Sequence, residues 1–418
     1  MEESKSFDWS TDLKEVPFRE WEDKFAWVEE PYISLDGETI AGIVNVEESV
    51  FTVCENGEAW DAVYDKAWNL RPLPKGKFAA CVNRDDEWTL SIGGNEWENR
   101  FDFIWDLQMN HDGSCLSLAV QKDSEYGMAV NDTPWENMYG NINEMVLSDT
   151  GSTAAVVQVS PLGQADIEGF KQGIFSCVVN GEAIDKNFLN IWDISFDSEG
   201  KNVAYGVRLD RTNYTIAVND TAWDKKFQSV WKPVFLSGGT SVIAPVKEGG
   251  KWVLYKDGQP FWKTRYNQIW KMAVSEKTGN IAAIASAKFG KWTIVQNDQP
   301  WNMAVDQMIS DLFYSRDGST LVAVLKEKEF WTLAVNQKKW DLNADKVFTP
   351  CISSDGKFVC VVIEKKGQYF MAVNNHLIPG GYDFMATPVI SPDNTQIMQK
   401  AIKDGVYQRR ILSMDKLL

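Results

Sequence analysis

Short hydrophobic runs alternate with polar turns along the whole chain. In the stretch 191–227 four such runs follow one another, at 191–196, at 203–207, at 214–218 and from Trp223 onward. They are rich in β-branched and aromatic residues and are bounded by Gly, Asn and Asp, a composition typical of short strands joined by tight turns. No segment shows a sustained helical period. The pattern therefore predicts an all-β chain made of four-stranded meanders.

Turn residues mark the same two hairpins in successive units. Asp-Gly pairs follow the first run of a unit, and Asn-Gly or Asn-Asp pairs follow the third. These dipeptides accept the positive φ angles that tight hairpins need. The pairs of the first hairpin are Asp36-Gly37, Asp112-Gly113, Asp317-Gly318 and Asp355-Gly356, and those of the last are Asn56-Gly57, Asn131-Asp132, Asn180-Gly181, Asn219-Asp220 and Asn297-Asp298.

Tryptophan recurs at a fixed place in the unit. The chain holds 19 tryptophans, and eight of them are separated by 39, 37, 38, 88, 39, 39 and 39 residues. These eight are Trp21, Trp60, Trp97, Trp135, Trp223, Trp262, Trp301 and Trp340. The gap of 88 is a double step, because Ile184 follows Asn180-Gly181 in the tryptophan position. A fixed period of this size is typical of propellers and solenoids, and we interpret these rings as a structural layer between adjacent sheets, with a fourth strand that starts at the tryptophan.

Two further aromatic series accompany the first. One opens the third strand of each unit, and the other opens the first strand. We expect most of these rings to pack between blades as well. The first-strand series is Trp27, Trp68, Trp105, Trp192, Trp231 and Trp270, and the third-strand series begins with Phe51, Trp88, Tyr126, Phe175 and Tyr214.

The two ends of the chain complete one unit. Residues 20–25 match the fourth strand of a unit, whereas 390–412 supply three strands and no fourth. With nine intact units between them, the sequence predicts a β-propeller of about ten four-stranded blades closed by the N- and C-terminal strands in one shared blade. Residues 1–19 are then an acidic N-terminal tail, and residues 20–418 form a single propeller domain. Two five-bladed rings are the alternative.

Parts of the repeat resemble known propeller families. The segments 147–154, 352–359 and 389–394 resemble the Ser-Pro-Asp-Gly turn of TolB-type and WD40-like repeats. That resemblance implies architecture only, since the Gly-His pair of strict WD40 repeats is missing. At the level of the whole chain, units of the form Val-Asn-Asp-x-x-Trp, such as 218–223, resemble the tryptophan-rich cytoplasmic subunit of the Tmc transmembrane electron-transfer complex of sulfate-reducing bacteria. This resemblance implies an accessory subunit beside haem and iron-sulfur subunits, with no catalytic residue of its own.

Charge and hydropathy limit the partners. The formal net charge is −17, and no cluster of Lys and Arg stands out, so we expect no nucleic-acid partner. No run of 18 apolar residues and no secretion signal occurs, which predicts a cytoplasmic protein without direct membrane insertion. Peripheral attachment at the inner face of the membrane would then go through partner subunits.

Residues for catalysis or cofactor binding are scarce. The chain has only two histidines, His111 and His376, and lacks C-x-x-C-H, G-x-G-x-x-G and G-x-S-x-G motifs. Its six cysteines are scattered without metal-ligand spacing. We therefore expect no metal, no cofactor and no enzymatic activity. The alternative is a small-ligand-binding or hydrolytic propeller that gathers acidic residues in its central channel.

Function in a repeat protein tends to lie where a unit departs from its period. Residues 160–173 lengthen one hairpin, and their apolar Leu162, Ile167 and Phe170 suggest a docking protrusion, with an ordinary flexible or self-packing loop as the alternative. In the tail, Trp9 is a second candidate for partner binding, because the tail is either a strap over the ring face or a segment that orders on a partner. The leading hypothesis is a protein-interaction scaffold.

Overall fold

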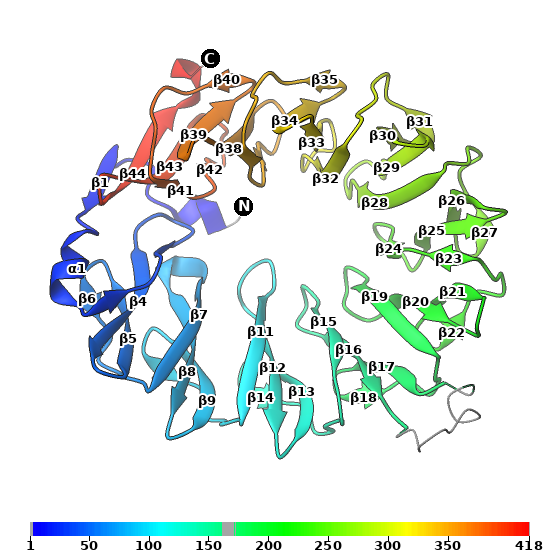
Figure 1. The fold of residues 1–418 in the computed structure, drawn as a ribbon, viewed down its shortest axis with the longest axis horizontal. Helices are drawn as coiled ribbons and strands as arrows, with labels where there is room; N and C mark the ends of the chain where they lie inside the picture. The colour runs from blue at the N-terminus through cyan, green and yellow to red at the C-terminus, as the bar shows by residue number, and fades with distance from the viewer. Residues whose placement is uncertain (1–2, 161–170, 172, 418) are drawn as a thin grey trace. The chain divides into compact units, whose positions relative to one another are not determined.

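The computed structural model describes residues 3–160, 171 and 173–417. Apart from one short α-helix and three short 3-10 helices, the regular structure in these residues consists of strands, which form ten antiparallel sheets. Figure 1 shows each sheet as a blade whose strands follow one another in chain order, except that β1 lies beside β44 in the shared blade. The fold is thus an all-β propeller of ten blades, as predicted. The blades divide into two compact units of five.

Unit 1 contains the described residues of 1–100 and 305–418. Its helical segments are η1 Glu3–Ser6, α1 Glu20–Lys24, η2 Pro74–Gly76 and η3 Met414–Lys416. Its blades are β2 Trp27–Val28, β3 Tyr32–Ile33, β4 Ile40–Glu47, β5 Val50–Glu55 and β6 Glu58–Ala59; β7 Lys66–Pro72, β8 Phe78–Arg84, β9 Glu87–Ile92 and β10 Asn95–Glu96; β32 Met308–Tyr314, β33 Leu321–Glu327, β34 Phe330–Val335 and β35 Lys338–Lys339; β36 Lys346–Val347, β37 Cys351–Ile352, β38 Val359–Lys365, β39 Gln368–Val373 and β40 His376–Leu377; and β41 Phe384–Met385, β42 Val389–Ile390, β43 Gln396–Lys403, β44 Val406–Ser413 and β1 Leu13–Val16.

Unit 2 spans Phe101–Ala304. Its blades are β11 Phe103–Met109, β12 Leu116–Lys122, β13 Glu125–Val130 and β14 Thr133–Pro134; β15 Asn143–Leu147, β16 Thr153–Gln158, β17 Phe175–Val179 and β18 Glu182–Ala183; β19 Asn190–Phe196, β20 Val203–Arg208, β21 Tyr214–Val218 and β22 Thr221–Ala222; β23 Ser229–Val230, β24 Val234–Phe235, β25 Val242–Glu248, β26 Lys251–Lys256 and β27 Gln259–Pro260; and β28 Gln268–Val274, β29 Ile281–Lys288, β30 Lys291–Gln296 and β31 Gln299–Pro300.

The last hairpin of a blade does more than reverse the chain. Asn180 and Gly181 both have positive φ, at 51° and 87°, as the Asn-Gly pair predicts for a tight turn. The Asn180 side-chain oxygen also accepts the backbone N–H of Thr153, at 2.8 Å, and so ties the turn to the start of the second strand. The same bond recurs from Ile40 to Asn56, Leu116 to Asn131, Val203 to Asn219, Ile281 to Asn297, Leu321 to Asn336 and Val359 to Asn374.

The repeat tryptophan ends the fourth strand, whereas the sequence pattern placed it at the start. In the β19–β22 blade the fourth strand is Thr221–Ala222, and the Trp223 N–H still donates to Ile216. Beyond Trp223 the chain bulges away and pairs again only at Phe227, while the hydroxyl of Thr215 bridges the bulge by donating to the Lys225 carbonyl at 2.8 Å. The bulge is what turns the indole off its own sheet.

Several of these indoles reach the following blade of the same unit. A Cβ added to Gly181 would lie 3.2 Å from Trp135, and equivalent contacts join Trp60 to Gly94 and Trp223 to Gly258. Trp21, Trp97, Trp135, Trp262, Trp301 and Trp340 are buried, and Trp60 and Trp223 are half-buried. The structure therefore confirms this series as core between blades, at the contacts named here.

The first-strand series behaves differently. Trp231 stacks on Trp252 of its own blade, with ring centroids 5.5 Å apart, because the two residues lie on the same face of one sheet. Trp27, Trp231 and Trp270 remain 50%, 37% and 47% exposed. The expectation that these three rings are buried between blades was wrong, since each keeps more than a third of its surface in solvent.

The two termini share one blade, as predicted, but through other residues. β1 pairs with β44, with Leu13 opposite Arg410, so the fourth strand lies inside the segment 1–19 that the sequence assigned to a tail. Residues 20–24, which were expected to be that strand, form α1. Pro17 interrupts the strand because it has no N–H to donate. Trp21 is nevertheless 2% exposed and packs in a core with Ile40 and Tyr407.

Trp135→Ala should lower the free energy of unfolding by about 3 to 5 kcal/mol, because it empties a buried site between blades. Trp270→Ala, which removes an equally large but half-exposed ring in the same unit, should cost less than about 1 kcal/mol. Urea unfolding followed by circular dichroism measures both. Equal losses of unfolding free energy in the two variants would show that both tryptophan series contribute equally to stability.

Candidate functional site

Three of the four predicted partner-binding residues, Leu162, Ile167 and Phe170, lie outside the described residues, so the docking protrusion stays a prediction. The fourth, Trp9, is half-buried, and its indole N–H donates to the Ser4 carbonyl at 2.9 Å. Its side chain thus contributes to holding the N-terminal segment together.

The N-terminal segment 3–12 lies along the shared blade. The backbone N–H of Ile411 donates to Asp12 at 2.9 Å, and the Gln396 side chain donates to Trp9 at 3.4 Å. The Arg409 guanidinium donates to the carbonyls of Thr11, at 3.0 Å, and of Asp8. Of the two interpretations of the tail, the structure thus shows the strap, which rests on the blade that its own chain completes.

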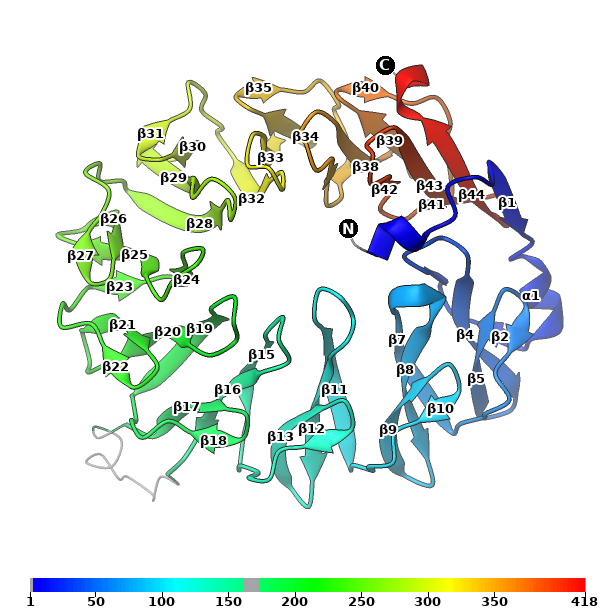
Figure 2. The same cartoon turned by 180° about the vertical axis from the view of Figure 1, so that it is seen from behind.

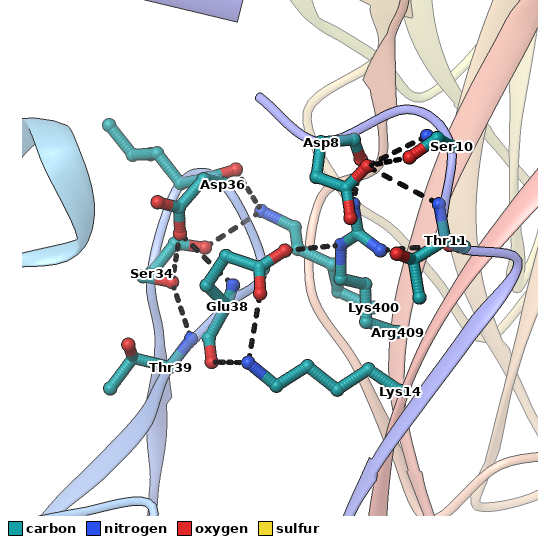
Figure 3. A network of polar contacts seen from close by, with 12 residues as sticks. Asp8, Ser10, Thr11, Lys14, Ser34, Asp36, Glu38, Thr39, Lys400 and Arg409 are labelled. Carbon is teal, nitrogen blue, oxygen red and sulfur yellow. Dashed lines mark hydrogen bonds and ion pairs between the residues drawn. The ribbon is translucent and has the colours of Figure 1, made fainter. Parts of the chain in front are cut away.

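Two buried cations fasten this strap and the adjoining blade (Figure 3). Arg409 is 0% exposed, and its Nε lies 3.1 Å from Glu38 Oε1. Lys400 is 3% exposed, and its ammonium donates to the carbonyls of Ser34 and Leu35 at 3.3 and 3.2 Å. The cluster therefore joins the strap, the turn after β3 and the strands β43 and β44.

Burial sets the electrostatics of this cluster. It lowers the pKa of Lys400 to about 8, against the opposing pull of the Asp36 carboxylate. In the strap, hydrogen bonds from the side chain and backbone of Ser10 hold the pKa of Asp8 well below its usual range. The sequence contains one indication that Lys400 is unusual. It places a charged residue in the second strand of its unit, whereas the equivalent strand of other units, such as 359–363, is apolar throughout.

The strap also covers a groove in unit 1, which we call the covered groove. It encloses about 200 Å³ between the β37 and β42 ends of two neighbouring blades, and the strap residues Ser4 and Phe7 line it. Figure 2 shows η1 beside β42. The blades contribute mainly Cys351, Ile352, Ser353, Val389, Ile390 and Ser391, which are the last residues of the first strands and the turns that follow.

Unit 2 has a larger groove at the same place in the repeat, which we call the open groove. It encloses about 560 Å³, and β15, β19 and β24, which provide much of its lining, lie side by side. The strand register shows that the two grooves are equivalent. In the open groove Phe235 pairs with Val242, the first residue of β25, and in the covered groove Ile352 pairs with Val359, the first residue of β38. The apolar lining consists of Val146, Leu147, Ile194, Phe196, Val234, Phe235, Leu236 and Val274.

Acidic groups border the open groove. Asp149, Asp197 and Glu276 line it together with one cation, Lys232. Burial pushes the pKa of Asp197 up, but hydrogen bonds from the Asn202 side chain and from backbone N–H groups outweigh it and leave this pKa below its ordinary value. The groove therefore combines an apolar floor with a negative rim, which suits a segment that is apolar and basic.

Within residues 3–160, 171 and 173–417 no three His, Cys, Asp or Glu side chains gather in a group that could hold a metal ion. Likewise, no helix of this part of the chain is long and apolar enough to cross a membrane.

Comparisons with known proteins concern the fold. No family model and no curated protein matches the sequence. A solved structure of a eukaryotic initiation factor aligns with 91% of this chain and 90% of that chain, at 9% identity and a TM-score of 0.49. A prolyl endopeptidase structure aligns with 72% and 54% (10% identity, TM-score 0.39), and TolB from Acinetobacter baumannii with 58% and 61% (11% identity, TM-score 0.31).

The buried Lys400 should make stability depend on pH. Its pKa is about 8 in the folded chain, against 10.5 for an ordinary lysine, so the unfolded chain binds the extra proton between these values and stability rises with pH across that window. The free energy of unfolding of the wild type, minus that of Lys400→Met, should increase by about 3 kcal/mol between pH 7 and pH 10.5. A constant difference would mean that Lys400 titrates normally.

Arg409→Ala should release the strap, because it removes two backbone contacts and leaves the Glu38 carboxylate without its buried partner. Chymotrypsin should then cleave after Phe7 or Trp9 at least tenfold faster. Arg410→Ala is the matched control, since the Arg410 guanidinium contacts Gln408. Equal cleavage of all three proteins would show that Arg409 does not hold the strap.

Proposed function

We propose that the protein is a non-catalytic interaction scaffold and serves as an accessory subunit of a membrane-associated electron-transfer complex. The open groove is the observation that supports the scaffold. It is the repeat-equivalent counterpart of a groove that the chain itself fills with Ser4 and Phe7. A surface of this kind suits a short segment from another protein.

The covered groove indicates how a partner segment would bind. There, one aromatic residue of the strap, Phe7, reaches the ends of two blades, while backbone carbonyls of the strap accept hydrogen bonds from Arg409. A partner segment in the open groove would place an apolar side chain against Phe235, and a basic side chain would face Asp197 or Glu276. Apolar anchors of this kind carry most of the affinity in peptide complexes.

The redox assignment rests on the resemblance of the Val-Asn-Asp-x-x-Trp units to the Tmc subunit. In this proposal the haem or iron-sulfur groups belong to the partner subunits, and the present chain carries none. Attachment at the inner face of the membrane goes through those partners. The role of the chain is to hold them in place.

The test is an affinity pull-down from solubilised membranes of the organism that encodes the protein, followed by mass spectrometry. We expect haem or iron-sulfur subunits in the eluate. Phe235→Lys should reduce their recovery at least tenfold, because it replaces the apolar floor and repels a basic segment. Glu276→Lys, at an exposed position, should reduce recovery through charge alone.

Phe330→Lys and Glu329→Lys are matched controls on an exposed hairpin of unit 1 and should leave recovery unchanged. Recovery of the protein alone, even after mild cross-linking, would overturn the proposed function. Partners that persist in both groove variants but are lost when residues 161–172 are deleted would move the docking surface to the predicted protrusion.

A further inference from the structure

The β32–β35 blade is one of those that lack a ring present in several other blades. In these blades an aromatic residue of the first strand covers an aromatic residue of the third strand. The centroid distances are 6.5 Å for Trp68 and Trp88, 6.1 Å for Trp105 and Tyr126, 5.9 Å for Trp192 and Tyr214, 5.5 Å for Trp231 and Trp252, and 5.6 Å for Phe348 and Tyr369. In the β32–β35 blade this position is Ser310, which follows Ile309 just as Trp270 follows Ile269 at the same register of another blade.

A cavity lies where the ring is missing. It encloses about 700 Å³, and Ser310, Phe313, Trp331 and Phe348 line it. The volume is ample for a small molecule. The third-strand ring that a first-strand aromatic would cover is Trp331, which is half-buried here. The lining is thus formed by β32 and β34 of this blade and by the start of the next blade in unit 1.

The other neighbour of the third-strand ring is retained. Lys326 Nζ lies 5.4 Å from the centroid of Trp331, as the Arg208 guanidinium lies 5.8 Å from that of Tyr214 in the β19–β22 blade. Both cations come from the second strand and pair directly with the aromatic residue. The β32–β35 blade therefore has the same cation over its third-strand ring as the β19–β22 blade and differs from it by the absent first-strand ring, so the space is suited to a flat aromatic group.

The charge beside the cavity favours a cation. Three carboxylate side chains, Asp311, Asp345 and Glu364, line it. They outnumber the two nearby cations, which are Lys346, 4.7 Å from the centroid of Phe348, and Lys326 beside Trp331. One oxygen of Asp345 accepts the backbone N–H of Lys366 at 2.6 Å, which fixes the carboxylate at the rim. An ammonium group next to these carboxylates and rings would gain both ion pairing and cation–π attraction.

We propose that this cavity is a binding site for a planar aromatic cation. The ring of the ligand takes the place of the missing first-strand aromatic and packs on Trp331. Its positive group faces Asp345 and Glu364. The site is independent of the open groove, which lies in unit 2, and of the scaffold function proposed above.

Tryptamine is the probe, because it is an indole with an ammonium group. Isothermal titration with the full chain should show saturable binding of one tryptamine, at least tenfold tighter than that of indole-3-acetate, which carries the same ring with a negative charge. Ser310→Trp should weaken tryptamine binding at least tenfold, since the indole of the repeat then fills the cavity. Ser310→Ala leaves the cavity open and should bind as the wild type does.

Fold integrity is checked with the same samples. Ser310→Trp restores the ring that equivalent blades carry, so its urea midpoint should equal or exceed that of the wild type. If it unfolds, Trp331→Leu is the second variant, and it should lose tryptamine binding because the packing surface is gone. Absence of saturable binding, equal affinity for the two indoles, or undiminished binding by the folded Ser310→Trp or Trp331→Leu protein would overturn the proposal.

Discussion

The structure depends on the burial of an indole from one blade against the last hairpin of the next. A four-stranded sheet has two faces and cannot cover both of them with its own side chains. The bulge after the fourth strand releases the tryptophan from its sheet, and the glycine of the neighbouring hairpin lets the ring approach closely, as Trp135 does at Gly181. Because the same asparagine that forms this hairpin also binds the second strand, the contact site is positioned by the blade that receives the ring.

The shared blade needs additional contacts, because its strands come from opposite ends of the chain. Pairing of β1 with β44 supplies the missing strand, and Trp21 supplies the indole from a helix instead of a strand end. Arg409 and Lys400 then bind carbonyls of the strap and of the adjoining turn, which are segments that the regular repeat does not join. Burying two cations is costly unless their donors are satisfied, so these contacts fix one arrangement of the termini.

The candidate sites all arise where the repeat changes. The covered and open grooves occupy one register position in two different units, and they differ in whether the strap fills them. The cavity at Ser310 lies where this blade has a small residue at a position that carries a ring in several other blades. In a repeat fold, the same position can be compared between blades. When one blade has a different residue there, the equivalent residues of other blades show which side chain would otherwise occupy that volume.

The sequence by itself determined the strands, the turns, the number of blades and the sharing of one blade by the two termini. These follow from local rules, namely the alternation of 214–218, the Asn-Gly turns and the spacing of the tryptophans. Tertiary structure decided that the fourth strand of the shared blade is Leu13–Val16, that Trp231 stays exposed and that Arg409 is buried. It also decided where the grooves lie. These outcomes depend on which side chains meet across strands that are distant in sequence. A periodic sequence pattern describes each unit by itself and does not show which of its surfaces the neighbouring blades leave exposed.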